Sequence, residues 1–341
     1  MPILVTGGTG LLGVNLVRQL VGDGQRVRLL VRSNPNRLGL ESDLIEFIRG
    51  DITDEASVLR AMQGCEEVYH VAAWVQVSSW GMNDAWRINV DGTRHICSAA
   101  LKLGVRRLVH TSSIAALATG SLDRPVDEST PWNLSGLHVP YYVTKRAAED
   151  VVREYVDKGL DAVIVNPGYL IGPWDIKPSA GRMLIQLAAG RVRVAPAHGG
   201  INFADVREAA AGHIQAMQRG RTGERYFLGG ENLSFRSFLT RAAAIADVAP
   251  PRIGLPFAAL YPFAVAGSVL GKWMPTAFRD TNLGTLRSGF LEHYATSRKA
   301  CTELGYQEVP IDRAIADALD WFADNGYLPA RTTTYQHRLP N

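Results

Sequence analysis

The start of the chain places a glycine-rich turn between an apolar run and an amphipathic stretch. Ile3–Val5 has strand character, and Leu11–Val21 has the apolar spacing of a helix. Gly7, Gly10 and Gly13 follow the run at a spacing of three. A strand, a turn of this type and a helix, in this order, are typical of a site that holds the pyrophosphate of a dinucleotide.

Each glycine has its own physical reason. Gly7 can adopt the positive φ of a tight turn, Gly10 lets the backbone approach the pyrophosphate, and Gly13 lets the helix lie close to the sheet. The helix N-terminus adds free N–H groups and a positive dipole. A tight turn without a ligand is the alternative. We predict a dinucleotide site here, formed by Gly7, Thr9, Gly10, Leu11, Leu12 and Gly13.

Strand-like runs alternate with helical patterns through the first half of the chain. This alternation predicts an α/β fold with a doubly wound parallel sheet, the Rossmann fold. The predicted strands are Ile3–Val5, Val27–Val31, Ile45–Ile48, Val68–Val71, Leu108–His110 and Ala162–Val165. The predicted helices are Leu11–Val21, Ala56–Met62, Asn83–Leu103 and Tyr141–Asp157.

The alternation weakens after Pro173. Helices are predicted at Asp205–Arg219, Ser234–Ala246 and Ile311–Asn325, and a strand at Glu224–Leu228. We therefore expect residues 1–173 to form mainly a dinucleotide-binding domain. Residues 174–330 are expected to form mainly a smaller mixed substrate-binding lobe, with some segments returning to the sheet, and residues 331–341 a polar tail.

Residues 255–275 form an apolar segment that carries no charge before Lys272. It is short for a membrane span, and Pro262 interrupts it. We expect a buried helix of the second lobe, and no integral membrane segment. A peripheral membrane contact or the lining of an apolar substrate channel are the alternatives.

The composition excludes several classes of protein. A net charge of +3 over 341 residues gives no reason to expect nucleic acid or an anionic membrane as a partner. Cys65, Cys97 and Cys301 are widely spaced, which matches no metal site, and their odd number argues against a disulfide framework. We expect a cytoplasmic protein that binds a small molecule and no metal.

The residue after the second predicted strand bears on the choice of cofactor. Enzymes that use NAD usually carry a carboxylate there, whereas this chain has Arg32 after Val31. A guanidinium suits a 2′-phosphate, so we predict NADP, with NAD as the alternative. Arg32 could equally be an exposed surface residue, and Arg37 is ambiguous in the same way. Asp51 could accept a hydrogen bond from adenine or cap a helix near Thr53.

Tyr141 and Lys145 lie four residues apart at the start of a predicted helix, which puts them on one face. An ammonium near a phenol lowers the pKa of the phenol, so this tyrosine could exchange a proton with a substrate. Tyr142 has no lysine at this spacing. Lys145 could also bind ribose hydroxyls.

Two serines, Ser112 and Ser113, follow the fifth predicted strand, at the sheet edge where ligands bind. We choose Ser113 as a hydrogen-bond donor to a substrate carbonyl, with a turn-capping serine as the alternative. Trp74 and Trp80 follow the fourth strand and are candidates for an aromatic substrate pocket or for core packing.

The motifs TGGTGLLG, GDITD, HVAA, INVDGTRHI, HTSSIAA and YYVTK occur in this order. Together they resemble the extended short-chain dehydrogenase/reductase family, of the NAD(P)-dependent epimerase/dehydratase type. VRLLVRS resembles its dihydroflavonol reductase branch. Other segments, such as RYFLGGENLSF, resemble the bacterial hopanoid-associated sugar epimerases.

The resemblance implies roles for further residues. It implies a catalytic triad of Ser113, Tyr141 and Lys145, and a homodimer built on the helices predicted at Asn83–Leu103 and Tyr141–Asp157. Asn166 matches a position that contacts substrate phosphate in nucleotide-sugar epimerases. The implied cofactor contacts or supports beyond the glycine turn are Asp51, Ile52, Ala72, Ala73, Asn89, Tyr141, Lys145 and Pro167.

Departures from the family pattern narrow the reaction. SSIAALATG lacks the acidic pair of the sugar dehydratases. Ile201 and Asn202 stand where many nucleotide-sugar epimerases carry an arginine for the diphosphate, which weakens such a substrate. Cations that could replace this arginine are Arg182, Arg191, Arg193 and Arg207.

Three functions follow. The leading one is an NADP-dependent oxidoreductase that reduces a ketone or aldehyde of a small, possibly apolar substrate. The second is a nucleotide-sugar or other sugar epimerase with tightly bound NAD(P). The third is a non-catalytic protein that senses NADP, against which the Ser-Tyr-Lys set argues because a sensor does not need it.

Overall fold

The computed structural model describes residues 1–33, 39–40, 42–274, 276–278, 280–329 and 335. Arg37 and all of the predicted tail except Tyr335 therefore lie outside the described residues. The strands are β1 Ile3–Thr6, β2 Val27–Val31, β3 Ile45–Arg49, β4 Glu67–His70, β5 Arg107–Thr111, β6 Ala162–Pro167, β7 Tyr169–Ile171, β8 Val194–Pro196, β9 Gly200–Asp205, β10 Arg225–Leu228, β11 Glu231–Ser234, β12 Ile253–Leu255 and β13 Glu292–His293. The helices are α1 Leu11–Gly22, α2 Glu55–Met62, α3 Met82–Trp86, α4 Gly92–Leu103, α5 Pro140–Asp157, α6 Arg182–Ala188, α7 Val206–Arg219, α8 Phe235–Ala246, α9 Phe257–Leu270, α10 Leu283–Gly289, α11 Arg298–Leu304 and α12 Ile311–Asp324.

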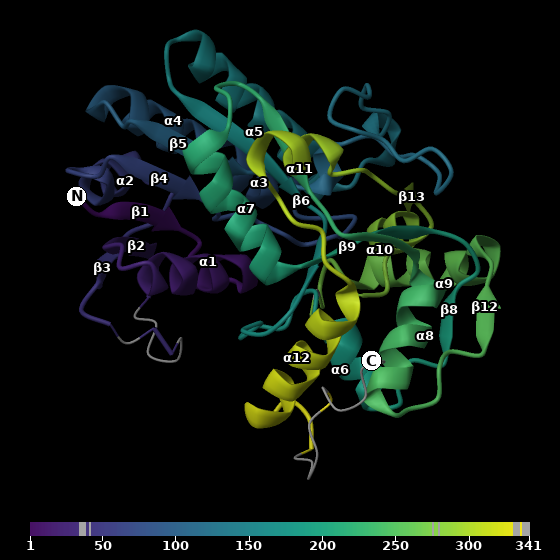
Figure 1. The fold of residues 1–341 in the computed structure, drawn as a ribbon. Helices are drawn as coiled ribbons and strands as arrows, with labels where there is room; N and C mark the ends of the chain where they lie inside the picture. The colour runs from purple at the N-terminus through teal and green to yellow at the C-terminus, as the bar shows by residue number, and fades with distance from the viewer. Residues whose placement is uncertain (34–38, 41, 275, 279, 330–334, 336–341) are drawn as a thin grey trace.

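The centre of the molecule is a seven-stranded parallel sheet in the order β10-β6-β5-β4-β1-β2-β3 (Figure 1). Its inner strands are almost entirely buried, because helices cover both faces. Helices α1 and α7 pack together on one face, and α2, α4 and α5 lie on the other. The predicted Rossmann-type α/β fold is confirmed.

After β3 the chain adds its next strands on the opposite side of β1, so the point at which the strand order reverses lies between β1 and β4. Strands β2 and β3 extend the sheet on one side of β1, and β4, β5 and β6 extend it on the other. In an open parallel sheet this reversal leaves a crevice at the carboxyl ends of the strands. The glycine turn after β1 and the loop after β4 both border this place.

A smaller lobe lies beside the sheet. Strand β9 pairs with β7, β11 and β13, while β8 pairs with β12 in a separate two-stranded sheet. Helices α6, α8 and α12 pack around β9, where the Phe203 and Phe238 rings stack at 3.9 Å. We propose the division near Pro173 as the boundary between the lobes.

Two later elements belong to the large sheet. Strand β10 pairs in parallel with β6 and forms the sheet edge, and α7 packs on α1. The strand predicted at Glu224–Leu228 therefore completes the dinucleotide-binding sheet and is no part of the smaller lobe.

Helix α9 corrects the expectation of a buried helix within residues 255–275. Only Ala264 and Gly267 are buried in α9, whereas Phe263 is 67% exposed and Trp273, just beyond the helix, 74% exposed. The helix packs along one side on α10, so its other side faces solvent. Across the described residues, no helix is both long and apolar enough to cross a bilayer.

Candidate active site

The glycine turn has the geometry of a phosphate cradle. Gly7 has φ +72°, and a Cβ there would lie 2.5 Å from the backbone nitrogen of Ala72. A Cβ on Gly13 would lie 2.1 Å from the Gly7 carbonyl oxygen, so the helix can approach the turn only without one. A Cβ on Gly10 would meet open space, with the Gly7 carbonyl oxygen as its nearest neighbour at 3.6 Å.

Gly10 also precedes the first turn of α1, and no side chain caps this end. The N–H groups of the first turn therefore point outward without intrahelical acceptors. Thr9 is partly exposed beside them, and Leu12 is buried beneath. The residues present fit a dinucleotide pyrophosphate, because both the space and the donors that it needs are in place.

The residues expected around the adenosine lie along the carboxyl ends of β2 and β3. Arg32 is exposed directly after β2. Asp51 Oδ1 accepts hydrogen bonds from the N–H and the hydroxyl of Thr53, both at 2.9 Å. Helix α2 is capped by Asp54, so Asp51 does not cap it. Ile52 is buried, and its side chain packs against Gly92.

Asn89 fixes the loop that follows β4. Its Oδ1 accepts a hydrogen bond from the Trp74 N–H at 2.7 Å, and its Nδ2 donates to the Trp74 carbonyl at 3.0 Å and to the Thr144 hydroxyl at 2.9 Å. The loop containing Ala72 and Ala73 is thereby tied to α5. Asn89 lies in a π-helical turn, Arg87–Asp91, which interrupts the helix predicted over Asn83–Leu103.

Ser113 and Tyr141 meet at the carboxyl end of β5. The Ser113 side chain lowers the pKa of the Tyr141 hydroxyl in part, so the two groups are near each other. The Ser113 oxygen also accepts a hydrogen bond from the Ala115 N–H at 3.2 Å, so this serine caps the following 3-10 turn as well. Ser112 is buried, and its hydroxyl donates to Glu149 at 2.7 Å. Ser113 is thus the serine that faces the tyrosine.

Burial dominates the electrostatics of Tyr141 and Lys145. It raises the pKa of Tyr141, and the Ser113 side chain lowers it in part. The pKa of Tyr141 is therefore raised, and the lowering expected from Lys145 is not found. Lys145 is 3% exposed, and its Nζ donates to the Thr111 carbonyl oxygen at 2.8 Å. Burial lowers the pKa of Lys145 to about 8, and the Glu149 carboxylate raises it in part.

Tyr142 has a different environment from Tyr141. It is 5% exposed, and its ring stacks on His293 at 6.0 Å between centroids. Burial raises the pKa of Tyr142 to about 12. It also belongs to a buried apolar cluster with Ala115, Leu134 and Val139, so it is a packing residue, while Tyr141 beside it is only partly buried.

A buried carboxylate, Glu149, lies one turn beyond Lys145 on α5. It accepts hydrogen bonds from Ser112 and from Asn166 Nδ2, at 2.7 and 2.6 Å, and forms an ion pair with Arg225 at 3.2 Å. Our sequence reasoning missed this residue. Its place four residues after Lys145, on the same helix face, is the signal that could have revealed it.

Asn166 lies on the sheet side of this group and not on an open surface. It is fully buried, and its amide donates to Glu149 and to the Ser113 carbonyl oxygen. The structure therefore places Asn166 as a support beneath Ser113, and does not bring it to a position open to substrate phosphate. Pro167 follows it at the buried end of β6.

The smaller lobe contains no free arginine at the position that many epimerases use for a diphosphate. Ile201 and Asn202 are buried, and Asn202 Nδ2 donates to the Gly230 carbonyl oxygen at 3.1 Å. Among the possible substitutes, Arg207 is engaged by Asp205 and Asp317. Trp74 packs on Gly81 and is bonded to Asn89, whereas Trp80 packs on Gly271 just beyond α9.

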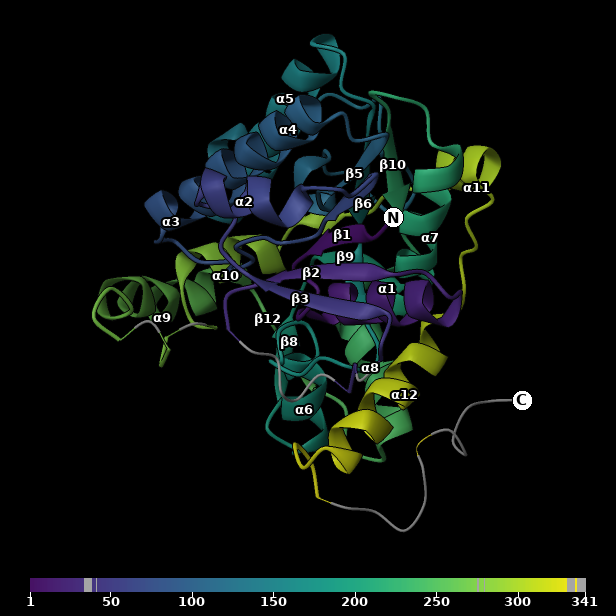
Figure 2. The same cartoon turned by 90° about the vertical axis from the view of Figure 1, so that its left-hand side faces the viewer.

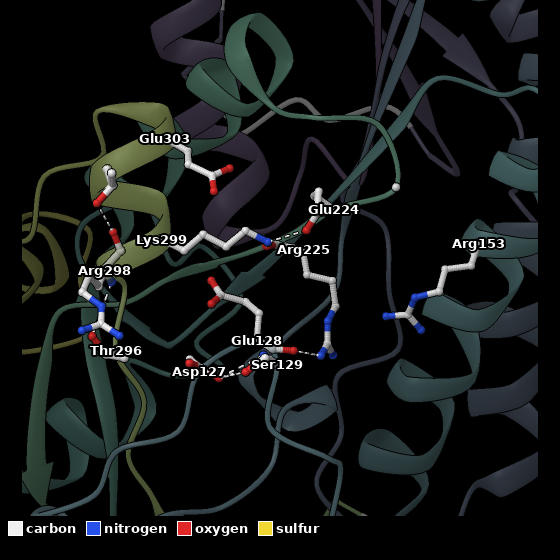
Figure 3. Close-up of a pocket in the computed structure, with 12 residues that line it drawn as sticks. Asp127, Glu128, Ser129, Arg153, Glu224, Arg225, Thr296, Arg298, Lys299 and Glu303 are labelled. Carbon is white, nitrogen blue, oxygen red and sulfur yellow. Dashed lines mark hydrogen bonds and ion pairs between the residues drawn. The ribbon is translucent and has the colours of Figure 1, made fainter.

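A charged pocket of about 480 Å³ lies elsewhere, around the amino end of β10 (Figure 3). Its polar groups largely pair with one another. Lys299 Nζ bonds to Glu224 at 2.6 Å and Arg225 to the Glu128 carbonyl. None of the predicted site residues lines this pocket.

Comparisons with known proteins agree with this geometry. The model of the family described as "NAD dependent epimerase/dehydratase family" matches residues 3–229. A putative dihydroflavonol 4-reductase of Synechocystis is 37% identical over 329 residues, 95% of both chains. Sterol demethylase protein B of Methylococcus capsulatus is 34% identical over 336 residues, 96% of this chain and 100% of that protein. The crystal structure of gox2253 superposes with a TM-score of 0.82 at 35% identity, covering 96% of this chain and 99% of the other.

Proposed function

Because the chain belongs to the NAD dependent epimerase/dehydratase family, within the extended short-chain dehydrogenases/reductases, we propose that it is an NADP-dependent reductase of ketones or aldehydes. The family establishes the coarser statement, that this is an NAD(P)-dependent oxidoreductase or epimerase. The finer proposal rests chiefly on one observation. The Ser113 side chain lies close enough to Tyr141 to lower the pKa of its hydroxyl in part, and Lys145 follows Tyr141 one turn later on α5.

In this proposal the glycine turn and the first turn of α1 hold the pyrophosphate, and Arg32 binds the 2′-phosphate. When bound, NADPH would supply the hydride that the reduction of a carbonyl carbon requires. Ser113 donates a hydrogen bond to the substrate oxygen as negative charge develops there. Tyr141 gives its phenolic proton to that oxygen, and Lys145 binds the ribose hydroxyls and favours the resulting phenolate.

Two observations favour a reductase over a nucleotide-sugar epimerase. The lobe residues Ile201 and Asn202 are buried, and Arg207 is held by carboxylates, so these positions offer no cation to a diphosphate. In addition, a relative that covers nearly the whole chain is named a putative reductase. A screen of carbonyl compounds and nucleotide sugars should therefore show NADPH oxidation with a carbonyl compound. Inversion of a sugar without net cofactor turnover would contradict the proposal.

The first prediction concerns cofactor preference. We expect NADP(H) to bind more tightly than NAD(H), because Arg32 is exposed at the end of β2 and can form charge-assisted bonds to a 2′-phosphate. Such a bond contributes about 1.5–3 kcal/mol, so Arg32→Ala should weaken NADP binding roughly tenfold or more and leave NAD binding unchanged. Titration of both proteins with both cofactors measures this. Equal affinities of the wild type for the two cofactors would remove the NADP assignment.

A second prediction concerns Glu149 as a positioning residue that acts through Lys145. Glu149→Gln keeps an oxygen for the Ser112 bond but removes the negative charge that raises the pKa of Lys145. The pKa of Lys145 should then fall below about 8. The proposed mechanism needs Lys145 in its ammonium form. The decrease in turnover at alkaline pH should therefore begin at a lower pH than in the wild type.

The matched control is Asp150→Asn, because Asp150 is the exposed neighbour that pairs with Arg153 and does not act on Lys145. Its pH profile should coincide with that of the wild type. A Glu149→Gln protein that is merely less stable, with an unshifted profile, would show that Glu149 has only a structural role.

A further inference from the structure

Helix α9 presents an apolar face to solvent. The exposed positions of α9 are apolar apart from the hydroxyl of Tyr261, and exposed Trp273 follows just beyond the helix. These positions are Phe257, Ala258, Ala259, Tyr261, Pro262, Phe263, Ala266, Val269 and Leu270. An exposed helix in water normally carries polar or charged residues on this side. Large exposed apolar patches mark contact sites with proteins or membranes.

Exposed apolar side chains are concentrated on this face and are not spread evenly over the surface. Of the 18 large apolar side chains that are exposed among the described residues, eight lie between Ile253 and Met274. The opposite side of α9 is fully engaged, since Gly267 lies against the backbone of Thr281 and Gly271 against the Trp80 ring. The exposed side therefore cannot turn inward without loss of this packing.

The charged side chains within residues 248–274 are all positive, and Asp247 and Asp280 lie outside this segment at either end. Residues 248–279 contain no acidic side chain. Arg252 and Lys272 are exposed near the two ends of α9. The parallel pairing of Ile253 with Val194 places Arg252 beside Arg193, so a second exposed cation lies at that end. An apolar helix with cations at its ends complements anionic headgroups above an acyl layer.

The shape favours a bilayer over a rigid partner. Figure 2 shows α9 at the margin of the molecule, projecting away from the central sheet. Apart from the cations near its ends, the exposed stripe offers only the Tyr261 hydroxyl and the Trp273 ring N–H to a protein interface, which typically has about ten hydrogen bonds. Tyr261 and Trp273 are exposed on the same segment, and such amphipathic rings prefer the boundary between headgroups and acyl chains.

We propose that the α9 face, residues 253–274, binds the surface of a lipid bilayer that carries anionic headgroups. Only one side of the helix enters the boundary, and nothing spans the membrane.

Helix α9 packs on α10, and the Thr285 hydroxyl of α10 donates to the Val77 carbonyl oxygen at 3.0 Å. Val77 packs in the same cluster as Tyr141. Docking would therefore bring the loop after β4 near the bilayer, where an apolar carbonyl substrate is dissolved; only this last consequence rests on the proposed function.

Sedimentation with vesicles tests the proposal on the whole protein. The wild type should bind vesicles of phosphatidylcholine mixed with phosphatidylglycerol more tightly than vesicles of phosphatidylcholine alone. The variant Phe263→Glu with Trp273→Glu should lose binding on the order of 100-fold, because two large apolar side chains no longer enter the bilayer. Arg252→Gln with Lys272→Gln should lose roughly 30-fold of the preference for the anionic vesicles.

The matched control is Phe47→Glu with Leu122→Glu, which adds the same charge at two exposed apolar positions away from α9. It should bind vesicles like the wild type. Quenching of tryptophan fluorescence by brominated lipid, absent in Trp273→Phe, gives a second measurement that needs no charged variant.

A wild type that binds neither vesicle overturns the proposal. So does a soluble dimer that only the Phe263→Glu and Trp273→Glu changes dissociate, since the face would then join two copies. Because none of these measurements requires turnover, failure of the reductase proposal would leave them unchanged.

Discussion

Tyr141→Phe should lower turnover by about 10²- to 10⁴-fold, the usual contribution of a general acid–base group. The substitution keeps the ring and its edge contact with Tyr142, at 6.2 Å between centroids, and removes only the hydroxyl near Ser113. The affinity for the cofactor should hardly change, because the glycine turn and Arg32 are untouched. Steady-state rates with a substrate from the carbonyl screen, together with a cofactor titration, measure both effects.

Tyr142→Phe is the matched control, since it removes a hydroxyl from the adjacent residue. Tyr142 is 5% exposed in an apolar cluster, so its substitution should affect turnover far less. Lys145→Ala should reduce both turnover and cofactor affinity, because the proposal gives its ammonium two roles. Undiminished turnover in Tyr141→Phe would contradict the mechanism. A wild type that binds NADPH tightly and turns over no compound in a broad screen would favour the NADP sensor.

Gly10→Val should abolish cofactor binding and leave the protein folded. A Cβ at this position enters open space, so the fold tolerates it, and the branched side chain then fills the place of the pyrophosphate. Losing two or more charge-assisted hydrogen bonds corresponds to a decrease in affinity of about 1,000-fold or more. Calorimetric titration with NADPH measures the binding, and circular dichroism measures the folded state.

Gly13→Val gives the contrast within the same turn. A Cβ there would lie 2.1 Å from the Gly7 carbonyl oxygen, so the strand and the helix could no longer approach each other. This variant should lose thermal stability as well as binding. If the Gly10→Val protein binds NADPH like the wild type, the turn has some task other than holding phosphate.

The sequence predicted the large sheet well because long periodic patterns and buried apolar strands leave little choice. Strand β2 has the predicted bounds, Val27–Val31, and α1 differs from its prediction by one residue. The short strands of the smaller lobe, such as β12 and β13, were not predicted. They have two or three residues, and pairing with distant partners, not local pattern, makes them strands.

Other features were wrong or invisible for physical reasons. The helix predicted over Asn83–Leu103 is present, but the π-helical turn within it was not predicted. Asn89 in this turn bonds to the loop after β4 and to α5, contacts that no local pattern encodes. The prediction of a buried helix at α9 was wrong because an apolar sequence does not show whether protein or another apolar phase covers it.

For the candidate site, the order of the motifs in the sequence predicted which residues lie close together in space. The environments that set their pKa values came only from the structure. Burial raises the pKa of Tyr141, where a lowering by Lys145 was expected, and Asn166 faces the buried Glu149 and not an open surface. The roles of Ser113, Tyr141 and Lys145 stay predictions until the variants are measured.

The late arrival of β10 has a consequence for how the protein is made. When the first 173 residues have left the ribosome, β6 is an unpaired sheet edge and the apolar side of α1 lacks α7. An exposed strand edge of this kind invites pairing with other chains. The native sheet can close only after residue 228 emerges, about two thirds of the way through synthesis. At ~5–20 residues per second, the stretch from 173 to 228 leaves that edge open for several seconds. Nascent chains paused within this interval should therefore be the ones that chaperones bind most strongly.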